Sequence, residues 1–276
     1  TKIINQLGLS SETSRLDSSA HPFCTTIGVG DYRITTRYDP DNLFSSLFST
    51  LHEAGHCLYE AGLNSDQRGL PRGEAVSLGV HESQSRFYEN IIGRSKEFCS
   101  FLSRVTGIND SDIYNEVNFV SPSLIRVEAD EVTYSIHIVI RFLLELALLK
   151  GELTVQDLPS AWNELYEKHL GLKPSSDREG VLQDVHWYSG AFGYFPTYVL
   201  GNIYGGMLLE KIKKDISDFD LLVSEGQFSK INNWFKENIY QYGSEFKPKD
   251  LIERVTSEKI SSKPFIEYLS LKHPFL

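Results

Sequence analysis

The stretch "LHEAGHCLYE", residues 51–60, places two histidines four residues apart, with a glutamate directly after the first. On a helix, His52 and His56 lie about 40° apart in projection and one turn above each other. Two imidazoles so placed suit two adjacent positions around a tetrahedral zinc ion. Glu53 flanks the same face, where a general base would take a proton from a metal-activated water. The pattern predicts a hydrolytic metal centre, and its alternative is a polar stripe on an amphipathic helix.

A third metal ligand must come from another part of the chain. The extended zinc motif needs a glycine and then a histidine on the same segment, but Tyr59 and Gly62 occupy those positions. The inverted order HxxEH is absent as well. A glutamate from the neighbouring sequence remains, and four are candidates: Glu60, Glu74, Glu82 and Glu89.

Position along the predicted helices separates these four glutamates. Glu60 lies on the histidine helix itself, too far along its axis to converge with both imidazoles. Glu74 begins the next helix, where an acid is expected for capping reasons, and Glu89 is spaced to pair with Arg86 at i+3. Glu82 lies in the middle of that helix, within "HESQSR", and is the best candidate for the third ligand.

The elements that must carry these residues are predicted to be mostly helical. "DYRITTRY", residues 31–38, alternates in the manner of a strand, and residues 1–20 form a polar segment. Residues 180–198 are rich in glycine and aromatics and predict several turns, and the C-terminal third predicts two or three further helices. The remaining apolar periodicity predicts helices over 41–62, 74–92, 95–106, 110–118, 121–151, 155–171 and 199–215. We expect one mainly α catalytic domain spanning 1–276, with a small sheet.

Composition excludes several classes of partner. The net charge of -10 and a pI near 5.3 argue against binding to nucleic acid or to anionic membranes. No apolar run reaches the roughly 18 residues that a spanning helix needs. Three cysteines without metal-ligand spacing predict free thiols in a reducing compartment, hence a cytoplasmic protein.

Six short motifs occur in a fixed order along the chain, and together they resemble those of the M32 carboxypeptidases, the thermostable or Taq-type family. Such a series is far more specific than the two-histidine motif alone. The motifs are "HPF" at 21–23, "DYRIT" at 31–35, "HEAGH" at 52–56, "HESQ" at 81–84, "IRVEAD" at 125–130 and "GVLQDVHW" at 180–187.

The resemblance implies a helical, zincin-like metallopeptidase with a small β-sheet near its active site. It implies release of C-terminal amino acids one at a time from peptides with a free C-terminus, usually by a homodimer. The metal would be held by His52, His56 and Glu82, with Glu53 as the catalytic glutamate. Family members are much longer, with this motif past their midpoint, so the chain is expected to correspond to their C-terminal catalytic part.

Recognition of a terminal carboxylate calls for an arginine, whose planar fork donates two parallel hydrogen bonds. Arg126 stands in an apolar context, and the family motif points to the same residue; its alternative role is an ion pair with Asp130 at i+4. Arg33 is a weaker candidate that would instead shape the closed end of a groove. The strand over 31–38 would align an extended peptide, or would be an ordinary sheet edge.

The oxyanion of the reaction needs a hydrogen-bond donor besides the metal. Tyr198 or Tyr194 would supply it, with His186 as an alternative, or else these tyrosines are ordinary core aromatics. His81 would orient Glu82 or contact substrate. Asp184 would fix an imidazole or cap a turn.

Zinc is the expected cofactor, although cobalt and manganese also accept two imidazoles and a carboxylate. Two rival functions remain open from the sequence. One is an endopeptidase or oligopeptidase that uses the same ligand set. The other is a truncated helical module that binds a metal or a partner without turnover.

Overall fold

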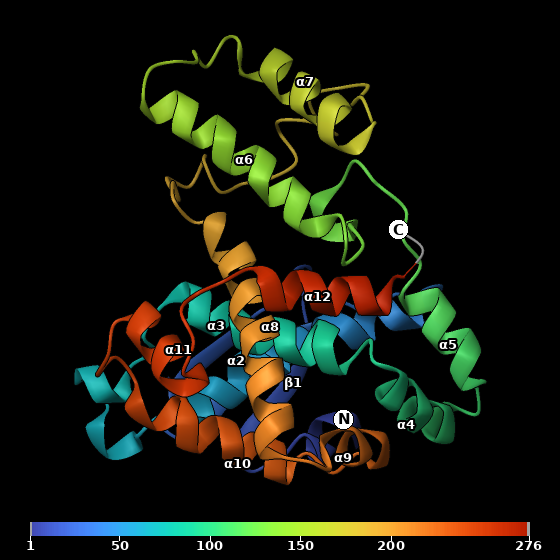
Figure 1. The fold of residues 1–276 in the computed structure, drawn as a ribbon, viewed down its shortest axis with the longest axis vertical. Coiled ribbons are helices and arrows are strands. Elements are labelled where there is room, and N and C mark those ends of the chain that lie inside the picture. Colours follow the sequence, from blue (N-terminus) through green and yellow to red (C-terminus); the bar gives the residue numbers. More distant parts are fainter. Residues whose placement is uncertain (1, 275–276) are drawn as a thin grey trace. The chain divides into compact units, whose positions relative to one another are not determined.

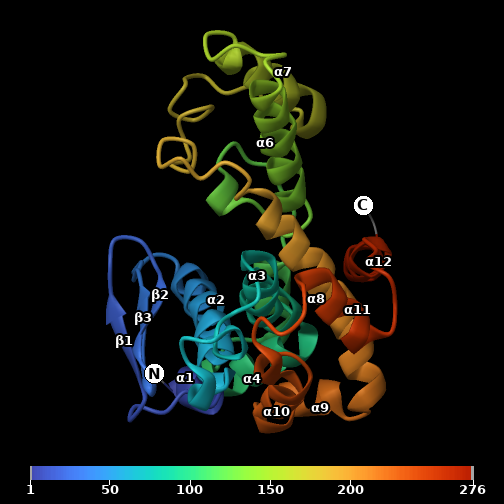
Figure 2. The ribbon, with the colours of Figure 1, turned by 90° about the vertical axis from the view of Figure 1, so that its left-hand side faces the viewer.

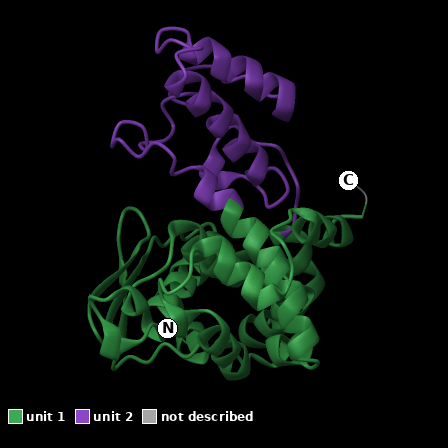
Figure 3. Ribbon diagram, turned by 60° about the vertical axis from the view of Figure 1, so that its left-hand side comes forward, with its two compact units in different colours: residues 1–117, 200–276 green, residues 118–199 purple. Residues whose placement is uncertain are grey.

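The computed structural model describes residues 2–274, which fall into two compact units. Unit 1 comprises the chain up to residue 117 together with the chain from residue 200 onward, and unit 2 comprises 118–199 (Figure 3). The expectation of a single domain over 1–276 stays a prediction.

The first part of unit 1 joins a small sheet to a series of helices (Figure 1). Asn42 caps the first long helix by accepting a hydrogen bond from the backbone N–H of Ser45. The elements are α1 (Lys2–Gln6), β1 (Ser14–Ser18), β2 (Cys24–Gly28), β3 (Asp31–Thr36), α2 (Leu43–Gly62), η1 (Ser65–Gln67), η2 (Pro71–Gly73), α3 (Leu78–Arg86), the π-helical η3 (Phe87–Ile92), α4 (Lys96–Thr106) and α5 (Asp110–Val117).

The C-terminal part of unit 1 is helical and packs around one apolar core with the first part. Up to residue 274 it contains four α-helices after α8, more than the two or three expected, and the boundary between the units falls within α8. The elements are α8 (Pro196–Asp215), α9 (Phe219–Glu225), α10 (Ser229–Asn238), η5 (Tyr240–Tyr242), α11 (Pro248–Thr256) and α12 (Lys263–Lys272).

The sheet lies beside α2, and α3 lies on the other side of α2 (Figure 2). Its strand order is β1-β3-β2, with β1 parallel and β2 antiparallel to β3. Tyr32 and Ile34 on β3 are buried towards the core, as the alternation predicts. The polar segment over 1–20 proves to contain α1 and β1, because β1 gains its hydrogen bonds from a strand some 18 residues away. The mainly α class with a small sheet next to the histidine helix is therefore confirmed.

Unit 2 contains η4 (Arg126–Glu128), α6 (Tyr134–Leu149) and α7 (Leu158–Leu170), with a core that includes Ile140, Leu144 and Trp162. The single long helix expected over 121–151 is wrong, since only its second half is α-helical. The Asp130 carboxylate accepts the backbone N–H groups of Val132 and Thr133, which fixes a turn just before α6.

Candidate metal centre

The two helices that carry the predicted ligands touch through their backbones. A Cβ placed on Gly55 of α2 would lie 2.6 Å from the carbonyl oxygen of Gln84 and 2.7 Å from the Cα of Ser85, both on α3. Gly201 of α8 makes a similar approach, with 2.8 Å to the Cβ of Glu82. Only glycine allows these separations, which bring α2 against the backbone of α3 and α8 against Glu82.

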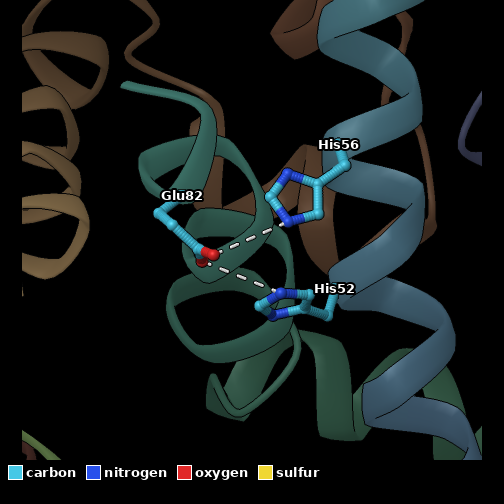
Figure 4. A group of neighbouring side chains, drawn as sticks. All are labelled: His52, His56 and Glu82. Carbon is cyan, nitrogen blue, oxygen red and sulfur yellow. Dashed lines mark ion pairs between the residues drawn. The ribbon is translucent and has the colours of Figure 1, made fainter. Parts of the chain in front are cut away.

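His52, His56 and Glu82 converge at this contact (Figure 4). The Nε2 atom of His52 lies 3.7 Å from Oε2 of Glu82, and Nε2 of His56 lies 3.9 Å from Oε1. The three ligand atoms lie within 4.8 Å of one another. These distances are too long for hydrogen bonds but suit donors that each reach one cation at about 2.0–2.2 Å. The donor set, two imidazoles and a carboxylate, is that of a catalytic zinc site.

Glu89 holds the outer nitrogen of His52, which is Nδ1, the ring nitrogen other than the one that faces Glu82. Nδ1 of His52 lies 2.7 Å from Oε2 of Glu89, whose carboxylate also pairs with Arg86 at 3.4 Å. Burial alone would raise the pKa of Glu89, but Arg86 and His52 lower it to about 2. Burial would likewise lower the pKa of His52, and its hydrogen bond to Glu89 raises it instead. The sequence predicted the pairing of Glu89 with Arg86 but not its bond to His52.

The outer nitrogen of His56 is held by a second histidine. Nδ1 of His56 lies 2.6 Å from Nδ1 of His81, and Nε2 of His81 lies 2.8 Å from Oε1 of Glu60. The hydrogen bond from His81 lowers the pKa of Glu60. Burial, and then the neighbouring charges of His52 and His81, lower the pKa of His56 well below its ordinary value. His81 thus contacts the ligand His56, whereas the sequence had placed it against Glu82 or the substrate; its substrate contact stays a prediction.

Glu53 lies beside the three ligands with only 8% of its surface exposed. Burial raises the pKa of its carboxyl group. Among residues 2–274, no hydrogen bond or ion pair engages this carboxylate. A buried carboxylate without a protein partner, on the ligand helix, is available to a water or a substrate.

Arg126 lies in unit 2, where it pairs with Asp184. Its Nε and Nη2 donate to Oδ1 of Asp184 at 2.9 and 2.8 Å, and its Nη1 donates to the hydroxyl of Tyr134 at 3.1 Å. Arg141, which is fully buried, donates through Nε to the other carboxylate oxygen at 2.6 Å. The suggested ion pair of Arg126 with Asp130 is therefore wrong. Asp184 binds two guanidinium groups, and its Oδ1 also lies 3.8 Å from Nδ1 of His186, so it contacts an imidazole as the sequence suggested.

The three candidate oxyanion donors also belong to unit 2. Nε2 of His186 lies 3.1 Å from the hydroxyl of Tyr198, and the rings of Tyr194 and Tyr198 pack at 5.4 Å. Arg33, in unit 1, is held at the surface by Asp31. The catalytic and substrate roles of these residues stay predictions.

The strand over 31–38 does not offer an edge to a peptide. Because β3 is the central strand, β1 and β2 occupy both of its edges. The sequence predicted either a peptide-binding edge or an ordinary sheet edge for this strand. Both predictions are wrong. Strand order depends on which distant segments reach β3, and its own alternation does not show this.

The free state of Cys24, Cys57 and Cys99 agrees with the sequence prediction, and Cys57 is buried outside the ligand group. No helix among the described residues is long and apolar enough to cross a membrane.

Comparison with known proteins identifies close relatives. Residues 1–273 match the family described as carboxypeptidase Taq (M32) metallopeptidase. The chain is 48% identical to thermostable carboxypeptidase 1 of Thermus thermophilus and 42% identical to carboxypeptidase 1 of Bacillus subtilis, over 100% and 98% of its length. It spans 56% of the length of each of these relatives.

Solved structures show the same arrangement of elements. A carboxypeptidase of Pyrococcus furiosus superposes with a TM-score of 0.95 at 42% identity, over 99% of this chain and 56% of that one. An M32 carboxypeptidase of Deinococcus radiodurans superposes with a TM-score of 0.93 at 40% identity, over 99% and 57%.

Proposed function

Because this chain belongs to the M32 family of metallocarboxypeptidases, we propose that it carries the catalytic centre of a metal-dependent carboxypeptidase. Its substrates would be peptides with a free C-terminus, from which it would release single amino acids. The observation that supports this most directly is the convergence of His52, His56 and Glu82, with the inner nitrogen of each imidazole turned towards the carboxylate.

The metal is proposed to be zinc, with cobalt and manganese as alternatives. The three residues fit such an ion because each imidazole has its outer nitrogen engaged by a protein group, which leaves Nε2 for coordination. When bound, the cation supplies Lewis acidity, which activates a water molecule and polarises the scissile carbonyl.

Glu53 is proposed as the general base. Its buried and unpartnered carboxylate would take a proton from the attacking water and deliver it to the departing amine. Tyr198, Tyr194 or His186 would donate a hydrogen bond to the developing oxyanion.

Arg126 is proposed to bind the terminal carboxylate of the substrate. A guanidinium has five N–H groups, and three hydrogen bonds to Asp184 and Tyr134 engage Arg126. Two N–H groups therefore remain for a bidentate contact. Asp184 and Tyr134 would hold the fork in place while it binds substrate.

Amino-acid release from a short peptide tests this proposal. We expect metal-free protein to regain activity on addition of zinc, and Glu82→Ala to lose both zinc binding and activity. Glu53→Gln should retain zinc but lose about 10²- to 10⁴-fold in kcat, because general base catalysis contributes that much. Undiminished activity of Glu53→Gln would refute the assigned role of this residue.

Two alternatives are distinguished by the same assay. An endopeptidase would cleave C-terminally amidated peptides as well as free acids, and Arg126→Ala would then raise KM equally for both. A non-catalytic metal-binding module is the second alternative, because this chain spans 56% of the length of its relative. Such a module would bind zinc without releasing amino acids. The expected homodimer and cytoplasmic location stay predictions, and light scattering in solution tests the first.

A further inference from the structure

We propose that His81 and Glu60 are positioning residues that fix His56 in its metal-binding tautomer, through a relay that runs from the metal site to the β-sheet. This inference rests on the proposed function, in that it takes His52, His56 and Glu82 to bind a divalent metal. The relay is defined here as His56, His81, Glu60 and Thr26.

The protons of the relay follow from its contacts. A carboxylate only accepts hydrogen bonds, so the His81 nitrogen that faces Glu60, Nε2, carries a proton. A neutral His81 then has a lone pair on Nδ1. The His56 nitrogen 2.6 Å away, also Nδ1, must therefore be the donor. The lone pair of His56 is left on Nε2, the atom that lies 3.9 Å from the Glu82 carboxylate.

The opposite proton order would disable the site. If His81 carried both protons and donated to His56, the proton of His56 would move to Nε2, which could no longer coordinate a cation. It would also place a second positive charge beside the metal. Metal binding through Nε2 of His56 therefore requires the first order, in which Glu60 accepts from Nε2 of His81 and Nδ1 of His81 accepts from His56.

The far end of the relay is fixed by the sheet. The hydroxyl of Thr26 on β2 donates to the second carboxylate oxygen of Glu60 at 3.2 Å. The ring of His81 contacts the rings of His56 and Tyr59, at centroid distances of 4.6 and 5.0 Å. The ring contact with Tyr59 and the hydrogen bonds to His56 and Glu60 hold this ring in one orientation.

The two histidine ligands are thus supported differently. His52 donates directly to a carboxylate, Glu89, whereas His56 reaches its carboxylate through an intervening imidazole. The relay makes a specific demand on Glu60: it must accept a hydrogen bond, but it need not be charged. A glutamine at this position would still accept from His81 through its amide oxygen, whereas a leucine of similar size would not.

Zinc and cobalt affinities, measured by chelator competition on metal-free protein, test the relay. We expect His81→Phe and Glu60→Leu each to weaken zinc binding about 10- to 100-fold, as loss of an outer-shell partner does. Glu60→Gln should keep most of the affinity. The double variant His81→Phe/Glu60→Leu should be no weaker than the weaker single variant, because both changes break one chain of contacts. His169→Phe, at an exposed position in unit 2, is the matched control and should bind zinc unchanged.

The outcomes separate the two proposals. If the unchanged chain binds neither zinc nor cobalt, the proposed function fails. If it binds zinc and Glu60→Leu binds equally well, the relay is overturned while the function stands. Nitrogen-15 chemical shifts of the zinc-loaded protein give a readout that needs no variant. They should show His56 protonated at Nδ1 and His81 at Nε2, and the reverse assignment would overturn the relay.

Discussion

Two arginines share one buried carboxylate in unit 2. Arg126 and Arg141 bind different oxygens of Asp184, and the Gln183 side chain accepts a further hydrogen bond from Arg141 at 2.8 Å. Burial would raise the pKa of Asp184, but the two guanidinium groups outweigh it and lower the pKa below its ordinary value. Asp184 therefore stabilises unit 2 in its ionised form.

Replacing Asp184 by asparagine should destabilise unit 2 in a pH-dependent way. Because its pKa is lower folded than unfolded, its contribution is complete above the unfolded pKa of about 3.9 and is lost as pH falls through the folded pKa. We expect Asp184→Asn to lower the free energy of unfolding by about 3–5 kcal/mol at pH 7, since two buried cations lose their anion. Urea unfolding at several pH values measures this.

The difference in free energy of unfolding between Asp184→Asn and the unchanged chain should become smaller below about pH 4. The control is Asp177→Asn, an exposed position in the same unit, for which we expect a change within about 0.5 kcal/mol. If this difference in free energy stayed constant down to the lowest accessible pH, ionised Asp184 would not be what stabilises unit 2.

At the level of elements, the crossing of α2 and α3 makes the metal site possible. Gly55, between the two ligand histidines, lets α2 approach the backbone of α3 at Gln84 and Ser85. The segment after α3 is π-helical over Phe87–Ile92, and it carries the Glu89 that holds His52. A change of helix type at a functional position is a common use of π-helical turns.

Gly55→Ala should separate these helices. Its added Cβ would meet backbone atoms at 2.6 and 2.7 Å, which cannot move as a flexible side chain would. We expect a loss of about 1–3 kcal/mol in the free energy of unfolding, typical of overpacking, and weaker zinc binding because Glu82 is displaced from the imidazoles.

The matched control is Gly28→Ala, whose Cβ would meet nothing within 4 Å. Thermal unfolding and zinc titration of both variants measure the effect. Equal zinc affinity in Gly55→Ala and the unchanged chain would show that close contact of the helices is not required.

For the whole molecule, all three proposed metal ligands lie in unit 1, and the residues proposed to recognise the substrate carboxylate and the oxyanion lie in unit 2. A metal that binds only the folded state stabilises it by about 2.7 kcal/mol when the free metal is about 100-fold above its Kd. Metal binding should therefore raise the free energy of unfolding of unit 1.

Zinc should raise the Tm of unit 1 by several degrees. Fluorescence of Trp234 reports on unit 1 if Trp162 and Trp187 of unit 2 are replaced by phenylalanine. The control is His52→Ala/His56→Ala, which should show no zinc-dependent rise. A Tm of the unchanged chain that does not respond to zinc would contradict the proposed site.

The sequence by itself placed His52, His56 and Glu53 together on one helix, because the spacing of three residues on one helix follows from its backbone periodicity alone. It also predicted that Glu82 would converge with the two histidines, from its position within a helix, and it predicted the mainly α class from apolar periodicity. The turn at Asp130, which shortens the helix expected over 121–151, was missed because a side chain there captures backbone N–H groups.

Only the tertiary structure decided which partners surround those residues. The bonds of His52 to Glu89, of His56 to His81, and of Arg126 to Asp184 join residues 37, 25 and 58 positions apart. The central place of β3 depends on β1 and β2 in the same way. Contacts of this kind depend on how closely two elements cross, which a glycine such as Gly55 permits but which local periodicity does not encode.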